Sequence, residues 1–314
     1  MKSQTKPEVI TVDKYCPLSF KPLTIDAIPE VRKIVARSPY RTCDYSVGGL
    51  FMWVDWFNYE YCIYRDTLFI RGLDERDRRR PSFAVPMGAM SVQESVALLK
   101  DYCASHNCGL LMSAVPQEAI DSLLGAGAVR IERLECWGDY LYGASDLAEL
   151  VGKAYNKKRN HVNRFMADNP GYVLEPIGEG NLAETQAFFA TLEHVEKVDE
   201  AEAEFERMQC ADVLARWNDY GFEGAVLRDG SGAVVAFTAA ETIGDTLIIH
   251  IEKMDHNVPG AGETINKLFA AYMTSRHPQI RYINREDDAG DPGLRRAKES
   301  YHPLRVLEKF NVEF

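Results

Sequence analysis

Near its end the chain reads Tyr282-Ile-Asn-Arg-Glu-Asp-Asp288 and then Gly293-Leu-Arg-Arg-Ala-Lys-Glu-Ser-Tyr-His-Pro303. The first segment predicts a short apolar strand ending in an acidic turn, and the second predicts a cationic helix that the proline ends. Asp291 is a suitable N-cap for this helix, with Pro292 at the first helical position. So many ionisable groups beside an apolar strand indicate a functional site within a mixed α/β fold.

A second cationic segment, Lys157-Lys-Arg-Asn-His-Val-Asn-Arg-Phe165, lies in the middle of the chain. If residues 147–166 form one helix, one stripe of it is apolar and the opposite stripe is cationic. The apolar stripe is Val151, Tyr155, Val162, Phe165 and Met166; the opposite stripe is Lys153, Lys157, Asn160 and Arg164, widened by Lys158 and Arg159. Five cations without an acid between them repel one another, and a bound polyanion would relieve that repulsion. The alternative is a solvated face neutralised by acids elsewhere.

These two segments resemble the C-terminal catalytic region of bacterial phosphatidylglycerol lysyltransferases and of their soluble uncharacterised relatives, over residues 135–314. The resemblance implies two tandem acyltransferase domains of the acetyltransferase (GNAT) type, similar to the Fem peptidyltransferases, each a mixed sheet flanked by helices. We expect the domains to span residues 1–145 and 146–314, with the active site in the second. The full lysyltransferases carry a membrane portion before this region, whereas no apolar run here approaches the ~18 residues that span a bilayer.

The local patterns agree with two α/β domains. In the first half, residues 61–70 predict two short strands around a tight turn, and residues 91–106 predict a helix before an apolar strand at 110–115. In the second half, a strand near 172–177, a helix from about Asn181 and a hairpin at Asp229-Gly230 repeat that order. The repetition suggests two related domains.

Composition limits the function. With 314 residues and 46% hydrophobic side chains the chain can bury two cores, and its formal charge of −11 does not favour nonspecific binding to nucleic acid or anionic membranes. The seven cysteines include no Cys-x-x-Cys pair, which predicts reduced thiols and neither disulfides nor a zinc site. Residues 1–15 have no apolar core of a signal peptide. We therefore expect a cytoplasmic protein.

The sequence Val258-Pro-Gly-Ala-Gly262 is the next candidate, between a predicted strand and a predicted helix. Glycines let a backbone approach a ligand, and free N–H groups at a helix start attract phosphate. In acetyltransferases the pyrophosphate loop occupies this place, so the resemblance suggests a cofactor-binding role for Gly260, Ala261 and Gly262. A simple turn is the alternative, and Glu263 places a carboxylate where a phosphate would be repelled.

Acidic side chains at strand ends are candidate general bases. Alternation along the strand that ends near Lys253 would place His250 and Glu252 on one face, close to the strand that precedes Glu286. Glu252 and Glu286 are therefore possible bases for an amine nucleophile, or anchors for a cationic substrate. Asp288 either contacts substrate or caps the following turn. The spacing of these acids matches no familiar calcium loop, so we expect no metal.

Two residues of the cationic helix complete the predicted catalytic group. A tyrosine near this place in many acetyltransferases protonates the departing thiolate, and the resemblance implies that role for Tyr301; the alternative is a half-buried ring with a hydrogen-bonded hydroxyl. Lys298 would neutralise an oxyanion or a donor phosphate, or pair with surface acids.

The sequence thus predicts an acyltransferase that moves an aminoacyl group from aminoacyl-tRNA to an amine or hydroxyl acceptor on a small molecule, lipid or peptide. The alternatives are an acetyl-coenzyme A-dependent N-acetyltransferase and a non-catalytic GNAT-fold binding module. No tightly bound cofactor is expected, because the donor is a substrate. The predicted substrate-binding residues are Lys157, Lys158, Arg159, Asn160, Asn163, Arg164, Asn284, Arg285, Asp288 and Arg295, where Arg285 and Arg295 could also simply pair with the nearby acids.

Overall fold

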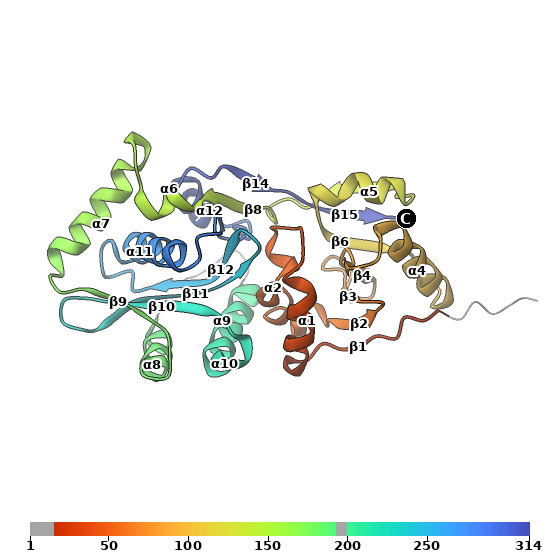
Figure 1. Cartoon of the computed structure of the whole chain (residues 1–314), viewed down its shortest axis with the longest axis horizontal. Helices are drawn as coiled ribbons and strands as arrows, with labels where there is room; N and C mark the ends of the chain where they lie inside the picture. Colours follow the sequence, from red (N-terminus) through yellow and green to blue (C-terminus); the bar gives the residue numbers. More distant parts are fainter. Residues whose placement is uncertain (1–15, 193–199) are drawn as a thin grey trace, which may run out of the picture.

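The computed structural model describes residues 16–192 and 200–314, which form two mixed sheets lying side by side (Figure 1). Helices flank both sheets, so the expected mixed α/β architecture is confirmed. The first sheet lies to the right in Figure 1 and the second to the left. Elements that follow one another in sequence mostly lie within one of these two units.

The first sheet has the strand order β1-β2-β3-β4-β6-β15-β7, with β5 beside β3. Its strands are β1 (Lys21–Pro22), β2 (Glu60–Tyr64), β3 (Thr67–Leu73), β4 (Pro81–Phe83), β5 (Met87–Gly88), β6 (Leu111–Pro116), β7 (Arg130–Arg133) and β15 (Lys309–Glu313). β4 and β6 pair in parallel, and the other pairs of this sheet are antiparallel among the residues described. The predicted hairpin is confirmed: Arg65 and Asp66, between β2 and β3, both have positive φ, as a type I′ turn requires.

Among the described residues, five α-helices accompany the first sheet. They are α1 (Ile28–Val35), α2 (Val47–Phe51), α3 (Val54–Phe57), α4 (Val92–Ser105) and α5 (Ile120–Gly125). The helix predicted for residues 91–106 is confirmed as α4, and its start is fixed by a capping box between Ser91 and Glu94. α1 and α2 lie on the side that faces the second unit (Figure 1).

The second sheet has the order β9-β10-β11-β12-β13-β8-β14. Its strands are β8 (Asp139–Gly143), β9 (Val173–Pro176), β10 (Glu223–Arg228), β11 (Val234–Ile243), β12 (Thr246–Met254), β13 (Tyr282–Asn284) and β14 (Arg305–Leu307). β12 and β13 are parallel, and the remaining described pairs are antiparallel. The parallel pair therefore occupies the same place in both sheets. In each sheet a helix connects its two strands, α4 between β4 and β6 and α11 (Ala261–Arg276) between β12 and β13.

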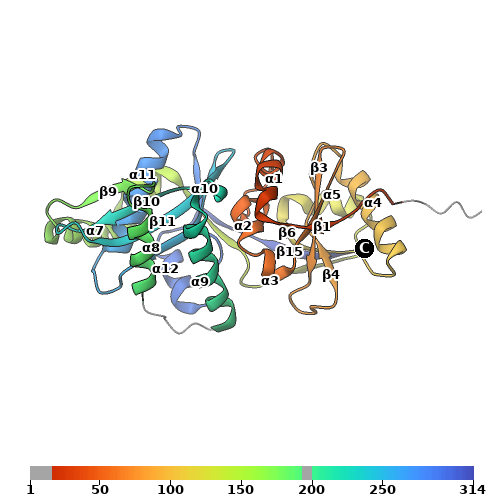
Figure 2. The same cartoon turned by 90° about the horizontal axis from the view of Figure 1, so that it is seen from below.

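Helices cover both faces of the second sheet. They are α6 (Ala144–Glu149), α7 (Asn156–Asp168), α8 (Leu182–Thr191), α9 (Glu200–Ala215), α10 (Trp217–Tyr220), α11 (Ala261–Arg276) and α12 (Pro292–Glu299). Figure 1 shows α7 and α11 on one face, with α8, α9 and α10 on the other. Seen from below in Figure 2, α8 and α9 run across that second face, on the side of α1 and α2. Asp291 caps α12 as predicted, accepting from the backbone N–H groups of Gly293 and Leu294.

The single helix expected over residues 147–166 is interrupted. Leu150 has a left-handed backbone (φ +55°) and Gly152 has φ +94°, so α6 ends at Glu149 and α7 begins only at Asn156. A left-handed residue ends an α-helix because its carbonyl no longer points along the axis. Val151 is consequently 69% exposed and does not belong to the apolar stripe that the sequence predicted.

The two units exchange their last strands. After β7 the chain crosses to the second sheet, where β8 lies between β13 and β14. After β14 it crosses back, and β15 lies between β6 and β7 of the first sheet. The domain division at residues 145/146 stays a prediction. β8 precedes it in sequence but pairs in the second sheet, and β15 follows it but pairs in the first sheet.

A buried ion pair joins the two exchanged strands at their first residues. The ammonium of Lys309, which begins β15, lies 2.7 Å from the carboxylate of Asp139, which begins β8, and 2.7 Å from that of Asp44. The Lys309 and Asp139 side chains are 1% and 0% exposed. Asp139 also accepts hydrogen bonds from the Cys43 N–H and the Asn284 amide. This cluster fixes the crossover between the units.

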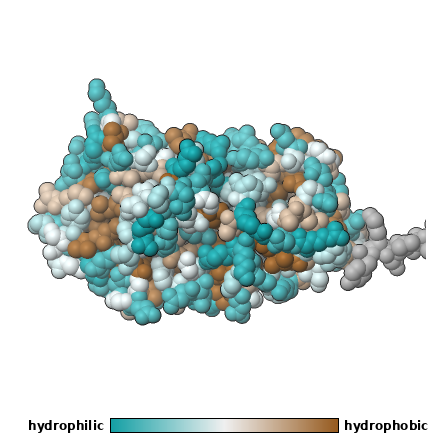
Figure 3. Space-filling model, in the orientation of Figure 1, coloured by the Kyte–Doolittle hydropathy of each residue, from teal (hydrophilic) through white to brown (hydrophobic). Residues whose placement is uncertain are grey.

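One apolar core runs through both units. Residues of α1 and α2 pack with Phe189 of α8, Val213 of α9 and Ile251 of β12 in one continuous cluster. On the view of Figure 3 the surface is mostly hydrophilic, and apolar residues form separate small areas. No helix among residues 16–192 and 200–314 combines the length and apolarity needed to cross a bilayer. All seven cysteines are free thiols.

Candidate active site

The two parallel strands of the second sheet separate at the predicted acidic turn. The pairing of β12 with β13 begins at Thr246 and Tyr282 and ends at Ile248 and Asn284. Beyond this point β12 continues, whereas the segment that follows β13 turns away from it. Glu286, two residues after the last pair, has a left-handed backbone (φ +58°). An opening between parallel strands gives side chains of neighbouring residues access to both faces of the sheet.

On the α11 face, Arg285 and Glu252 form the centre of a buried cluster. Their side chains are 13% and 11% exposed, and Arg285 Nη2 lies 2.7 Å from Glu252 Oε1. The other Glu252 oxygen accepts from the amide of Asn266, a residue of α11. Both Glu252 oxygens are therefore occupied. Arg285 Nη1 and Asn266 Oδ1 are buried without a hydrogen-bond partner in the part of the chain described, which leaves one donor and one acceptor available here.

Tyr301 forms one wall of this cluster. The guanidinium of Arg285 lies 4.8 Å from its ring centre and the ammonium of Lys158 lies 3.9 Å from it. Within the described residues no hydrogen bond reaches the Tyr301 hydroxyl, and burial raises its pKa. Lys158 also lies 3.3 Å from Glu263, and burial lowers the pKa of its ammonium group. Lys158 thus points into the site, whereas the preceding residue, Lys157, is exposed to solvent.

The alternation expected along β12 fails at His250. The register of β11 and β12 shifts between Ala239 and Ala240, which pair with Ile251 and Ile249, so His250 is an extra, bulged residue. Ile249 packs in the cluster with α11, whereas Ile251 packs in the core shared with the first unit. His250 and Glu252 consequently face opposite sides of the sheet, and the prediction that they share a face is wrong.

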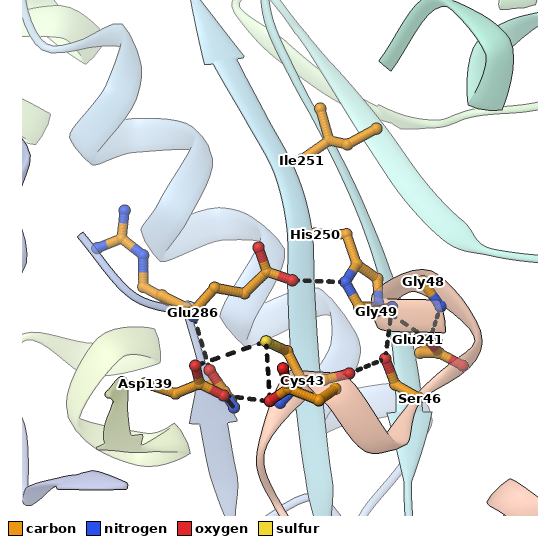
Figure 4. A network of polar contacts seen from close by, with 12 residues as sticks. Cys43, Ser46, Gly48, Gly49, Asp139, Glu241, His250, Ile251 and Glu286 are labelled. Carbon is orange, nitrogen blue, oxygen red and sulfur yellow. Dashed lines mark hydrogen bonds and ion pairs between the residues drawn. The ribbon is translucent and has the colours of Figure 1, made fainter. Parts of the chain in front are cut away.

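His250 lies between two carboxylates at the boundary of the units (Figure 4). Its Nε2 is 2.9 Å from Glu241 and its Nδ1 is 2.7 Å from Glu286, and its side chain is 1% exposed. Burial alone would lower the pKa of the imidazole, but the hydrogen bonds and charges of the two glutamates outweigh it and raise the pKa to about 9. At neutral pH the ring is therefore a cation that bridges two carboxylates.

The first unit contributes directly to this arrangement. The backbone N–H of Gly48, in α2, donates to Glu241 over 2.7 Å. A Cβ at Gly48 would collide with the His250 ring, so only glycine permits this approach of α2 to β12. Glu286 remains 27% exposed, and only its Oε1 is bonded to a described side chain. Its second carboxylate oxygen has no hydrogen-bond partner among the described residues.

Lys298 stabilises the acidic turn through hydrogen bonds to its backbone. Its ammonium donates to the backbone carbonyls of Arg285, over 2.7 Å, and of Asp287. The residue is 7% exposed, and burial lowers its pKa. Burial also raises the pKa of the adjacent Asp287 to about 6. In this structure Lys298 positions the turn that carries Arg285 and Glu286.

Asp288 and Arg295 form an ion pair away from the strand opening. Arg295 Nε lies 2.8 Å from Asp288, and the Tyr140 hydroxyl donates to the same carboxylate over 2.6 Å. Burial opposes the charge of Asp288, but these hydrogen bonds outweigh it and lower its pKa. Asp288 also accepts from the Gly290 N–H, so it bends the turn before α12. Both alternatives raised for Asp288 and Arg295 from the sequence, pairing and capping, are realised here.

The glycine loop lies at the start of α11. Gly260 has φ +83°, and a Cβ on it would collide with the backbone carbonyl of His161 in α7. A Cβ on Gly262 would lie 2.8 Å from the Met254 side chain. Both glycines, with Ala261 buried between them, therefore allow α11 to pack closely against α7 and β12. The helix start still offers backbone N–H groups without a side-chain cap.

The cationic residues of α7 divide into two groups. Arg159 donates to the backbone carbonyls of Leu150 and Gly152 and so closes the break before the helix. Lys157, Asn160 and Asn163 are exposed, and Arg164 is 68% exposed with Asp168 at 3.4 Å. No acid pairs with Lys157 in the described residues. The outward group forms a small cationic surface on the same face of the sheet as Arg285.

The site also contains groups that sequence reasoning does not identify. Among the described residues, Cys43, Asp44 and Asp139 form the one cluster with metal-ligand spacing, but Lys309 already supplies a cation there, 3.4 Å from the Cys43 sulfur. The strand pattern alone marks Glu241 only as part of a strand. A single charged residue in the otherwise uncharged strand Val234–Ile243 is the signal that could have identified it.

The comparisons with known proteins agree with the fold. The family model described as "Phosphatidylglycerol lysyltransferase, C-terminal" matches residues 35–313. A conserved protein of unknown function from Bacteroides thetaiotaomicron is similar to the chain with a TM-score of 0.84 and 27% identity, over 95% of this chain and 99% of that one. L-PGS from Bacillus licheniformis is similar with a TM-score of 0.64 and 14% identity, over 91% of each chain.

Two further proteins show more distant similarity to the chain. FemX shares the fold with a TM-score of 0.56 and 9% identity, over 94% of this chain and 97% of that chain. An uncharacterised protein of Mycoplasmoides gallisepticum is 22% identical over 188 residues. The chain spans 56% of the length of that curated relative. Together with the strand orders above, these results confirm two tandem GNAT-like units.

Proposed function

The chain belongs to the family of phosphatidylglycerol lysyltransferase C-terminal domains, and from this premise we propose that it transfers an aminoacyl group from aminoacyl-tRNA to an amine or hydroxyl acceptor. The observation that carries the proposal is the separation of β12 from β13. There Arg285 and Glu286, adjacent in sequence, contact groups on opposite faces of one sheet. A donor held on one face can thus meet an acceptor held on the other.

The α11 face suits a phosphate-bearing donor. Lys157 and Arg164 extend from α7 into the solvent, while Lys158 and Arg285 lie deeper, against Tyr301. Exposed cations can hold the phosphates of an acceptor stem, and the deeper ones can stabilise the negative charge that develops on the carbonyl oxygen. Nη1 of Arg285, which has no hydrogen-bond partner in the described part of the chain, could donate to that oxygen.

The opposite face suits the acceptor. One Glu286 oxygen has no partner within residues 16–192 and 200–314, and protonated His250 holds the other oxygen in place. In the proposed step the acceptor amine or hydroxyl attacks the ester carbonyl and its proton passes to Glu286. The ester bond then breaks and the proton leaves with the ribose hydroxyl. Glu252 positions Arg285, since both of its oxygens are already bonded.

An acyl-coenzyme A donor is the second candidate. The observation that favours it is the uncapped start of α11, which follows β12 as the pyrophosphate loop does in acetyltransferases. Glu263, in the first turn and only 3.3 Å from Lys158, opposes an anion at that place. The charge of the site therefore favours the tRNA donor.

Separate titrations distinguish the two donors. Charged tRNA, uncharged tRNA and acetyl-coenzyme A would each be added while the unfolding temperature is measured. A ligand that binds only the folded chain raises stability by about 2.7 kcal/mol at one hundred times its Kd. We expect charged tRNA to stabilise the chain and acetyl-coenzyme A to have no effect. The reverse result would favour acetyl transfer, and the absence of any shift would favour a non-catalytic binding module.

A further inference from the structure

Glu241 is the single charged residue of β11, and its side chain is 5% exposed. Removing a carboxylate from water is costly unless bonds inside the protein replace the lost hydration. Burial accordingly opposes the charge of Glu241, but the hydrogen bond and the charge of His250 outweigh it and lower the pKa of the carboxyl. Glu241 is therefore an ionised group kept inside the protein, next to the proposed reaction centre. Buried ionised groups at such places are candidates for a task in catalysis.

The first unit helps to hold this carboxylate. Its Oε1 accepts from the backbone N–H of Gly48 over 2.7 Å and lies 2.9 Å from His250 Nε2. Its Oε2 lies 3.9 Å from the guanidinium of Arg32, a residue of α1. Figure 4 shows Gly48 close to both His250 and Glu241. The position of Glu241 is thus set across the boundary between the two units.

Packing fixes the orientation of the His250 ring. The ring of Phe222 is stacked on it, with centres 5.1 Å apart and an angle of 26° between the planes. Gly48 approaches so closely that a Cβ there would collide with the imidazole. Because the side chain is also 1% exposed, the ring has little room to turn. Nε2 therefore stays directed at Glu241, and Nδ1 stays directed at Glu286.

The number of protons on the ring follows from this orientation. An ionised carboxylate only accepts hydrogen bonds, a neutral imidazole has one N–H and an imidazolium has two. Only the imidazolium can donate to Glu241 and Glu286 together. A neutral ring that keeps its proton on Nε2, for Glu241, directs a lone pair at Glu286. The second proton of the ring is therefore what holds the Glu286 carboxylate in place.

Other charged and titratable groups act on this arrangement from neighbouring elements. In the described chain they include Arg32 of α1, Cys43 of the first unit, Lys253 of β12 and Lys298 of α12. Burial raises the pKa of the Cys43 thiol, so it stays neutral near pH 7. The cations oppose a further positive charge on the ring. The two carboxylates are thus the groups that retain the second proton of His250.

We propose that Glu241, held by the first unit, is a positioning residue for the transfer reaction. It acts through His250, because it keeps a proton on both ring nitrogens and so fixes the direction of the Glu286 carboxylate. Glu241 touches neither donor nor acceptor and neither gains nor loses a proton in the step. This inference rests on the function proposed above, in which Glu286 takes the acceptor's proton. It gives the first unit a part in the reaction of the second.

A titration of the His250 ring by ¹⁵N NMR tests the proposal without any donor. Wild type should show both ring N–H groups at pH 7 and lose one of them near pH 9. In Glu241→Gln the amide oxygen should take the place of Oε1, because Gly48 donates there, and should still accept from Nε2–H. Without the carboxylate charge, the Nδ1 proton should leave at least about one pH unit lower. His250→Gln identifies the signals.

The same variant should change the pH dependence of transfer from charged tRNA. Glu241→Gln should lower kcat about tenfold at pH 8 and less at pH 6, where the ring still carries both protons. KM should stay nearly constant, since Glu241 contacts no substrate. A residue with a merely structural role would lower stability without moving this profile. Glu223→Gln is the matched control, because Glu223 of β10 lies 2.7 Å from His277 and forms another glutamate–histidine pair.

An unchanged ring titration or an unchanged kcat profile in folded Glu241→Gln would overturn the proposal. If that variant does not fold, a wild-type ring with a single N–H at pH 7 has the same meaning. The two failures can be told apart. Transfer with the same pH profile in both chains would contradict only this inference. A ring titration that shifts as expected, in a chain that transfers nothing from charged tRNA, would contradict the proposed function itself.

Discussion

The openings at β4/β6 and at β12/β13 each have a left-handed residue two positions after the last parallel pair, but their chemistry differs. In the first unit the left-handed residue is an alanine and the surroundings are aromatic rings and hydroxyls. In the second it is a glutamate, next to an arginine and bonded to a buried histidine. The GNAT-like backbone therefore supplies a place between two strands, and the side chains decide what happens there. On this comparison we propose the second opening, and not the first, as the reaction centre.

Replacing Glu286 with glutamine tests whether Glu286 is the general base at the second opening, and it should have the largest effect. The amide keeps the size of the side chain but cannot accept the acceptor's proton, so turnover should fall about 10²- to 10⁴-fold. Steady-state transfer assays with charged tRNA measure this. Glu299→Gln, at an exposed position of α12, is the control. If Glu252→Gln lost more activity than Glu286→Gln, the two glutamates would have to exchange their proposed roles.

Replacing Lys309 with methionine tests whether the two openings are held together by the exchanged strands. Asp139 would remain buried and would lose the cation paired with it, an effect of about 3 to 5 kcal/mol in comparable buried pairs. We expect a correspondingly lower free energy of unfolding in urea. A change below about 1 kcal/mol would show that the buried pair does not stabilise the crossover.

The pKa of His250 predicts a loss of stability at high pH. Because the folded pKa, about 9, lies above the ordinary value of 6.5, the imidazolium contributes fully below pH 6.5, and its contribution is lost as pH rises through 9. The contribution is about 3 kcal/mol from the shift itself. Urea unfolding between pH 6 and 10 should show the decrease. In His250→Gln it should be smaller, and an identical pH profile in that variant would assign the effect to another group.

Gly48→Ala should disturb the packing of the first unit against the second opening. The added methyl group collides with the His250 ring, and overpacking of this kind costs about 1 to 3 kcal/mol. Gly178→Ala, where a Cβ meets nothing within 4 Å, is the matched control. Thermal unfolding of both variants measures the difference. Equal stabilities would mean that α2 can move away from β12 at little cost.

The smallest expected effect concerns the exposed cations of α7. Lys157→Glu with Arg164→Glu should weaken binding of charged tRNA and make its dependence on salt concentration shallower, by about one unit of slope for each phosphate that the helix no longer neutralises. Binding measured at low and at moderate salt concentration reports this. Unchanged affinity at low salt would exclude this surface from the donor site without affecting the assignment of the reaction centre.

Sequence patterns predicted the mixed α/β architecture and several of its local features, while the assignment of site residues stays a prediction. Local features such as the helix over residues 91–106 and the Asp291 N-cap depend on nearby residues, so the sequence alone reveals them. The bulge at His250 could not be predicted, because it depends on how β11 and β12 pair. The approach of Gly48 to His250 joins residues that lie about 200 positions apart, and no periodicity reports such a pair. Resemblance supplied the fold family, which the comparisons confirm.

The exchanged strand β15 also has a consequence for synthesis on the ribosome. The first sheet lacks a strand between β6 and β7 until residues 309–313 are available. At 5 to 20 residues per second, roughly 9 to 36 seconds pass between the translation of β7 and that of β15. During that time the edges of β6 and β7 are open to other strands. The nascent first unit is therefore the stage at which this protein is most exposed to misassembly and to chaperones.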